Sequence, residues 1–374
     1  MHKMRKSHRK AQKIPEKRPR WRRYLIAGAL IGAATVMLSQ SLKTEERPEL
    51  QTRQVEHHRL ETVERIERKE DKSAIENFFE RFSIPASELI TEIKVDCCHI
   101  LVFNETSTVI KRLKVREIAW GTANALYRDL EGQLHGLAVV KLPNDEEMDA
   151  NRNGTRSQVL RASLRKELSD MEMKDFSRDQ IVEKIRQSIP GNEMERYISE
   201  MIALGEILKY YFYEKNGPEM TRRTVFVDSA VHEAVHCAHM KYDYEHGINP
   251  FARTDEKVAA GERLAYLAEA AYGIRPSFSL TFLLEDAITE RMEGGDGPAN
   301  ALIAGLLRRL SLSRPLDIFV KGEDEIRQAS LDVLNYETIS QYRMEAGYII
   351  PAKDFEEIRK AGEMFFDNVL HGNR

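Results

Sequence analysis

The feature that most constrains this chain of 374 residues is a pair of histidines, His232 and His236, with Glu233 between them, in the segment VDSAVHEAVHCAHM (residues 227–240). If this segment is helical, both imidazoles project from one face of the helix, about one turn apart. Two ligands of one zinc ion need this spacing. The carboxylate of Glu233 can then reach a water held by the metal, which is where metal-assisted hydrolysis needs a base.

The residues around this HExxH segment are suited to a buried metal helix. The flanking positions are uncharged: Val231, Ala234, Val235, Cys237 and Ala238. A β-branched and aromatic stretch at residues 224–227 predicts a short strand, and Asp228 and Ser229 are good N-caps for a helix that begins after it. With this segment the chain resembles the zincin metallopeptidases. The alternative interpretation of His232 and His236 is a pair of ordinary hydrogen-bonded histidines on an amphipathic helix.

The resemblance implies a third zinc ligand further along the chain. The metzincin branch needs HExxHxxGxxH, but here His239 replaces the glycine and Tyr242 replaces the third histidine. His239 is therefore expected to be a neighbour of the site and not a ligand, because three ligands from one straight helix fit a tetrahedral ion badly. In the gluzincin branch the third ligand is a carboxylate from a later helix, which is the arrangement we expect here.

Two predicted helices offer that carboxylate. The helix at residues 255–272 carries Glu262 in ERLA, similar to the ExxA pattern of several gluzincins, and the helix at residues 278–292 carries Asp286 in DAITE. We favour Glu262, because it lies on a mostly apolar face where an unpaired charge would cost several kcal/mol. Asp286 is the rival. Glu269, two turns after Glu262, is expected to support the site or to substitute as a ligand.

The remaining polar candidates around the motif are less constrained. His246, Tyr244 and Tyr266 are candidates for an additional donor to the oxyanion. The chain has three cysteines, so at least one thiol is unpaired within an exported chain, and no disulfide framework is predicted. We interpret Cys97 and Cys98 as structural and Cys237 as a small core residue.

The N-terminal part predicts a membrane protein. Residues 1–23 carry eleven Lys or Arg and one acid, and residues 24–42 carry no charge, close to the length of about 20 that spans a bilayer. The basic residues place a cytoplasmic tail before a single transmembrane helix, and the rest of the chain outside the cytoplasm. A cleaved signal peptide, with Ser39 and Ser41 near the cleavage site, is the alternative. Arg22 and Arg23 also resemble, weakly, a twin-arginine export signal.

The charged segment at residues 43–72 cannot bury enough apolar surface to fold alone, so it predicts a solvated stalk. A coiled coil that pairs two chains as a homodimer is the alternative, although its heptads are not sustained. The net charge of −3 argues against a nucleic-acid partner.

Folded structure is expected from residue 73. A capping box predicts a short helix at residues 73–82, and strands are expected at residues 98–103, 109–115 and 135–142. Residues 116–130 are interpreted as a helix. These elements make a small α/β subdomain, residues 73–150, in which one strand is expected to be the edge that pairs with an extended substrate. A polar loop at residues 143–154 leads to a helical metallopeptidase domain, residues 151–374.

The clearest helix of that domain, at residues 192–216, is expected to pack behind the motif helix. Residues 241–254 are expected to form a loop after the motif. Further helices are expected near residues 299–310, 323–334 and 352–370.

The sequence therefore predicts a membrane-anchored zinc metallopeptidase that cleaves a peptide or protein substrate outside the cytoplasm. Its catalytic domain is expected to be α+β and zincin-like, mostly helical with a small sheet. His232, His236 and Glu262 would hold Zn²⁺, and Glu233 would be the general base. Two alternatives stay open: a catalytically inactive membrane scaffold or sensor with a zincin-like fold, and a zinc amidase that acts on a non-peptide amide such as a cell-wall component.

Overall fold

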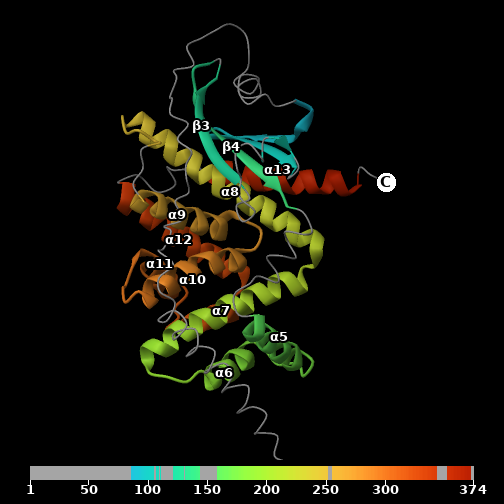
Figure 1. Ribbon diagram of the computed structural model, residues 1–374, viewed down its shortest axis with the longest axis vertical. Helices are drawn as coiled ribbons and strands as arrows, with labels where there is room; N and C mark the ends of the chain where they lie inside the picture. The colour runs from blue at the N-terminus through green and yellow to red at the C-terminus, as the bar shows by residue number, and fades with distance from the viewer. Residues whose placement is uncertain are drawn as a thin grey trace, which may run out of the picture.

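Helix α8 (Gly217–Glu245) has 29 residues and lies between a small sheet and a layer of shorter helices (Figure 1). The computed structural model describes residues 86–104, 107–108, 110, 121–129, 131–143, 158–251, 255–342 and 352–371. The elements before α8 are η1 (Ala86–Glu88), β1 (Leu89–Lys94), β2 (Cys98–Asn104), β3 (Gly121–Arg128), β4 (Leu134–Leu142), α5 (Gln158–Glu172), α6 (Arg178–Ser188) and α7 (Glu193–Lys215). Those after it are α9 (Asp255–Tyr272), α10 (Pro276–Met292), α11 (Pro298–Arg309), η2 (Pro315–Val320), α12 (Glu323–Tyr342) and α13 (Ala352–His371). The fold is α+β and mostly helical, as the sequence predicts.

The sheet is mixed and has the order β1-β2-β4-β3. β1 and β2 form an antiparallel hairpin, β2 and β4 are parallel, and β3 and β4 are antiparallel. Residues of one face, including Cys98, Ile100, Ala138 and Val140, belong to the main core together with α8. Gly136 of β4 lies against Cys237 of α8 so closely that a Cβ atom there would overlap the cysteine side chain. The sheet and α8 therefore touch directly behind the histidine motif.

The second face of α8 packs against α9, and α13 lies beside both α8 and β1 (Figure 1). One continuous core of buried side chains runs from β1 to α13 and contains residues of α8, α9, α10, α11 and α12. α7 was expected to pack behind the motif helix; it contacts α8, but it packs mainly against α10. The motif helix is thus the element that joins the sheet to the helical layer.

Most predicted elements are present. The strands expected at residues 98–103 and 135–142 are confirmed as β2 and β4, and the helix at residues 192–216 is confirmed as α7 with Asn192 as its N-cap. The helices at residues 255–272 and 278–292 are confirmed as α9 and α10, and the three later helices are α11, α12 and α13. Regular apolar spacing over long segments explains this agreement.

Three local predictions are wrong. Residues 224–227 were expected to be a strand with Asp228 and Ser229 as N-caps, but all of them lie inside α8. Phe226 and Val227 are fully buried in the core, and Ser229 Oγ donates to the carbonyl of Val225 at 2.7 Å within the helix. Tertiary packing therefore outweighs the weak strand propensity of this stretch.

The second wrong prediction concerns the helix at residues 116–130. Within it, residues 121–128 form β3, because their backbone pairs with β4. The third is the loop at residues 241–254, since α8 continues to Glu245 before the chain turns at residues 246–251.

Several predictions concern residues outside the described ones. These are the basic tail at residues 1–23, the transmembrane helix at residues 24–42, the stalk at residues 43–72, the helix at residues 73–82 and almost all of the strand at residues 109–115 and the loop at residues 143–154. Within the part of the chain that the structure describes, no helix combines the length and the apolar character that a membrane crossing requires.

Candidate metal centre

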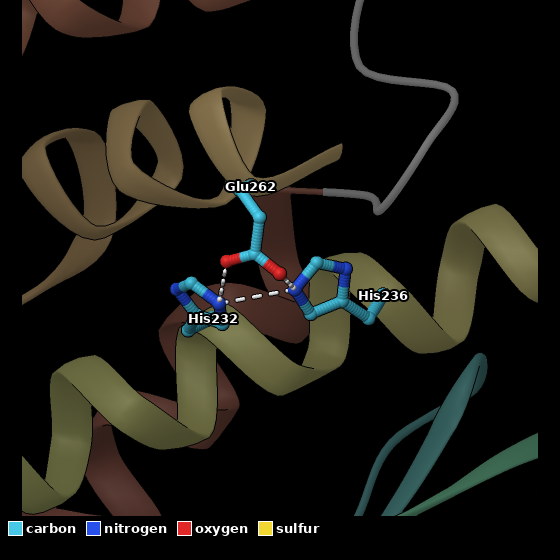
Figure 2. Close-up of side chains that lie close together, drawn as sticks. All are labelled: His232, His236 and Glu262. Atoms are coloured by element: carbon cyan, nitrogen blue, oxygen red, sulfur yellow. Dashed lines mark hydrogen bonds and ion pairs between the residues drawn. The ribbon is translucent and has the colours of Figure 1, made fainter. Parts of the chain in front are cut away.

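α8 presents His232 and His236 on the face that it turns toward α9 (Figure 2). The four-residue spacing places the two rings one turn apart, with their centroids 4.8 Å apart and their planes at 67°. Their Nε2 atoms approach each other to 3.0 Å. Both imidazoles therefore direct a nitrogen at the same point above the helix.

α9 brings Glu262 to that point from the opposite side (Figure 2). Its Oε2 lies 3.2 Å from Nε2 of His232, and its Oε1 lies 3.3 Å from Nε2 of His236. Each carboxylate oxygen thus faces one imidazole. The structure brings together all three residues that the sequence selects as metal ligands.

The two imidazoles and the Glu262 carboxylate lie close enough together to hold one ion. With zinc bonds of about 2.0–2.1 Å, neighbouring ligand atoms of a tetrahedral site lie about 3.3 Å apart. The two Nε2 atoms lie 3.0 Å apart, and two different oxygens of Glu262 lie 3.2 and 3.3 Å from them. Among the described residues, these three are the only group of histidine, cysteine and acidic side chains with ligand atoms close enough to hold an ion. The two nitrogens and one carboxylate are a typical donor set of catalytic zinc, which keeps its fourth position open.

Glu269 supports this group from the other side of His232. Its Oε1 lies 2.5 Å from Nδ1 of His232, and the Glu269 side chain is buried. Histidines that bind metals usually donate the N–H of their second nitrogen to a carboxylate, which fixes the tautomer and leaves the first nitrogen free to bind. Of the two roles expected for Glu269, the geometry favours the supporting one.

The charges of the group compensate one another. Burial alone would lower the pKa of His232, but its contacts with Glu262 and Glu269 outweigh burial and raise that pKa well above its usual range. Burial alone would raise the pKa of Glu262, but His236 and His232 hold it well below its usual range. The group therefore favours positive charge between the two imidazoles and the carboxylate, as a cation site requires, and metal binding at such a site is coupled to proton release.

Glu233 lies on the side of α8 that faces the sheet. It is only 6 % exposed, and among the described residues its Oε2 has no hydrogen-bond partner. Burial raises the pKa of Glu233, although His236 and His232 act in the opposite direction. A buried carboxylate without a partner is costly unless it has a function or a ligand.

Gly121, at the start of β3, makes room for Glu233. A Cβ atom at residue 121 would lie 2.6 Å from Cγ and 2.9 Å from Oε1 of Glu233. Every other residue type would therefore displace the carboxylate. Sequence reasoning missed Gly121, because its only signal is a glycine at the start of a segment that was expected to be helical.

Asp286, the rival third ligand, is not part of the group. It lies on α10, and burial raises its pKa to about 6. Asp286 interacts electrostatically with Tyr266 and Glu262, so it lies near the site. It is not one of the grouped ligand residues.

The three candidate oxyanion donors separate in the structure. The Tyr266 ring lies 5.3 Å from the His232 ring, one turn after Glu262 on α9. Tyr244 and His246 lie at the end of α8, where Arg128 covers the Tyr244 ring and His246 stacks on Tyr242. Of these three, only Tyr266 contacts one of the proposed metal ligands, His232.

The other residues around the motif behave as expected. His239 is buried and does not belong to the group of ligands. Cys237 is buried against the sheet, and Cys97 and Cys98 are buried free thiols whose pKa values burial raises well above the usual range. A buried, protonated thiol is not reactive, so these cysteines fill the core.

Comparisons of this chain with protein-family models, with curated proteins and with solved structures find no match. The geometry of the site itself therefore indicates what this protein can do.

Proposed function

We propose that this protein is a zinc-dependent metallopeptidase with a zincin-like catalytic domain. The observation that carries the proposal is the convergence of His232, His236 and Glu262 at zinc-like separations, with the buried carboxylate of Glu233 one residue after the first ligand. An HExxH segment that was only an amphipathic helix would not require a third acid from another helix to face both imidazoles. The donor set and the adjacent base together fit metal-assisted hydrolysis.

The roles of the protein side chains follow from their positions. Zinc, when bound, lowers the pKa of a water molecule and polarises the carbonyl of the substrate. Glu233 takes the proton from the attacking water and returns it to the leaving amine, and its raised pKa suits a group that must both accept and give a proton near neutral pH. Glu269 holds the tautomer of His232. Tyr266 is proposed to donate to the oxyanion.

The sheet supports an extended peptide as the substrate. Of the described strands, β3 is at the end of the sheet next to the site, and it pairs only with β4. Gly121 is the first residue of this strand and lies against Glu233. A peptide that adds to the free edge of β3 would pass the base and the metal group with its backbone fixed by hydrogen bonds. A small amide substrate would have no use for such an edge.

The location of the enzyme follows from the N-terminal sequence. We propose that residues 24–42 anchor the chain in the cell membrane, with the basic tail in the cytoplasm and the catalytic domain outside. The charged segment at residues 43–72 then separates the domain from the membrane, and pairing of two such segments would give a homodimer.

The test of this function is metal removal from the purified native protein. We expect about one zinc per chain by elemental analysis, cleavage of an unstructured protein substrate such as casein, and loss of cleavage when a chelator removes the metal. Addition of zinc should restore cleavage. A folded protein that takes up no zinc would overturn the proposal and favour a scaffold, whereas zinc without cleavage of any peptide would favour an amidase.

Gly121→Ala is expected to lower turnover about 10- to 100-fold without loss of zinc, because the new methyl group displaces the Glu233 carboxylate by a fraction of an ångström to about 1 Å. Gly205→Ala in α7 is the matched control, since no atom lies within 4 Å of a Cβ there. Measured kcat and zinc content of both variants check this prediction. Native turnover in Gly121→Ala would show that Glu233 does not need its present position.

A further inference from the structure

The contact by which Glu269 supports His232 depends on the position of the last turn of α9. Glu269 lies in the last turn of α9, and its contact with Nδ1 of His232 is only 2.5 Å long. A shift of that last turn by about 1 Å would take the contact beyond hydrogen-bond range, because N–H···O bonds extend to only about 3.2 Å. What fixes the end of α9 therefore also fixes the orientation of His232.

Asp228 of α8 binds the backbone of Ile274, the second residue after this end. It lies one turn before His232 on α8 and is only 4 % exposed. Its Oδ1 accepts a hydrogen bond from the backbone N–H of Ile274 at 3.1 Å, and the hydroxyl of Ser279 in α10 donates to its Oδ2 at 3.1 Å. One buried side chain thus connects α8, the α9–α10 turn and the start of α10.

The turn itself is shaped for this contact. The N–H of Gly273 donates to the carbonyl of Glu269 at 2.7 Å, and Arg327 of α12 donates to the carbonyls of Ala271 and Gly273 at 3.1 and 2.7 Å. A Cβ atom at Gly273 would overlap Oδ1 of Asp228 and would lie 2.5 Å from the carbonyl oxygen of Glu269. Glycine is therefore the residue that lets Asp228 approach the backbone of this turn.

We infer that Asp228 is a positioning residue that holds Glu269 against His232 and thereby sets the affinity of the site for zinc. The contacts form a closed ring, from Asp228 through Ile274 and the last turn of α9 to Glu269, and from Glu269 through His232 back to α8. The helix that carries two ligands thus also carries the anchor of the group that orients one of them. This inference rests on the proposed zinc site.

Asp228 acts through the hydrogen bonds that it accepts from Ile274 and Ser279. Burial, and then the nearby Glu269, raise the pKa of Asp228 well above its usual range, against the hydrogen bonds from Ile274 and Ser279 and the more distant Arg327. An amide of the same shape can accept the hydrogen bond from Ile274 and can donate to the Ser279 hydroxyl. Asp228→Asn is therefore the conservative change, and Asp228→Ala is the disruptive one.

The experiment measures zinc affinity of the full chain by competition with a chromogenic chelator. Removal of a residue that orients a ligand usually costs 10- to 100-fold in affinity, so one step further out we expect a loss of about tenfold for Asp228→Ala. Gly273→Ala should give a similar loss, although it touches no ligand. Asp228→Asn should stay within about threefold of the native protein. Asn300→Ala is the control, since Asn300 is also 4 % exposed and donates to the carbonyl of Ala287 at the other end of α10.

A second readout does not depend on zinc. In the metal-free protein, nitrogen NMR of labelled histidine should show the Nδ1–H of His232 in its hydrogen bond to Glu269, and this signal should weaken in Asp228→Ala and Gly273→Ala. Native affinity in both variants, or an equal loss in Asn300→Ala, would overturn the inference. If Asp228→Ala does not fold, Gly273→Ala decides alone. A native protein that shows the His232 signal but takes up no zinc would refute the proposed function. The NMR comparison would then still test the ring of contacts.

Discussion

Glu233→Gln should lower the turnover of peptide hydrolysis at least about a hundredfold and leave zinc in place. The amide has the shape of the carboxylate but cannot accept a proton, so the water would lose its base while the three metal-binding side chains stay where they are. Removal of a general base typically costs a factor of about 10² to 10⁴ in turnover. Because Glu233 is buried and its Oε2 meets no hydrogen-bond partner in the part of the chain that the structure describes, the substitution replaces a carboxylate that lacks a partner there and should not lower stability.

The measurement is kcat together with zinc content and the midpoint of thermal unfolding. Glu285→Gln on α10 is the matched control, because that side chain is 58 % exposed and pairs with Lys209 at the surface. The control should retain native turnover. If Glu233→Gln hydrolyses peptides at the native rate, Glu233 is not the base, and the buried carboxylate needs another explanation.

Glu262→Gln should lower the affinity for zinc by on the order of a hundredfold or more, whereas Asp286→Asn should leave it nearly unchanged. The oxygens of Glu262 lie 3.2 and 3.3 Å from the two Nε2 atoms, and a neutral amide is a much poorer zinc ligand than a carboxylate. Asp286 is also an acid on a neighbouring helix, but it does not belong to the group of ligand atoms.

Elemental analysis after dialysis, followed by competition with a chelator, checks this pair of variants. Thermal unfolding gives a second measure, since a ligand that binds only the folded state raises its stability by about 4 kcal/mol at a thousand times its dissociation constant. After a hundredfold loss of affinity in Glu262→Gln, the same zinc concentration should give only about 1.4 kcal/mol. Loss of zinc in Asp286→Asn with retention in Glu262→Gln would reverse the assignment of the third ligand.

The three proposed metal ligands could be predicted from the sequence because the pattern that indicates each of them is local. His232 and His236 share one helical turn, and the apolar spacing of residues 255–272 defines α9 with the bounds that the structure shows. Glu262 could be selected because a carboxylate on an apolar helix face needs a partner, although nothing in the chain says which partner. The choice against Asp286 needed the relative placement of two helices.

Local propensity failed where tertiary contacts outweigh it. The stretch at residues 224–227 has β-branched and aromatic side chains, yet it is helical because those side chains fill the core between α8 and α13. Residues 121–128 include good helix formers, yet they form a strand because β4 offers them a backbone partner. Such preferences amount to less than about 1 kcal/mol per residue, so burial of one large side chain can reverse them.

By itself the sequence indicated that one helix carries His232, Glu233 and His236 with the spacing of zinc ligands and a base, and that long amphipathic helices follow it. The tertiary structure alone decided which distant residues complete the site: Glu262 as the facing acid, Glu269 and Asp228 behind His232, and Gly121 beside the base. The physical reason is that helical periodicity is a short-range property of the chain. Contacts between α8, α9 and β3 depend on how the faces of these elements pack in one core.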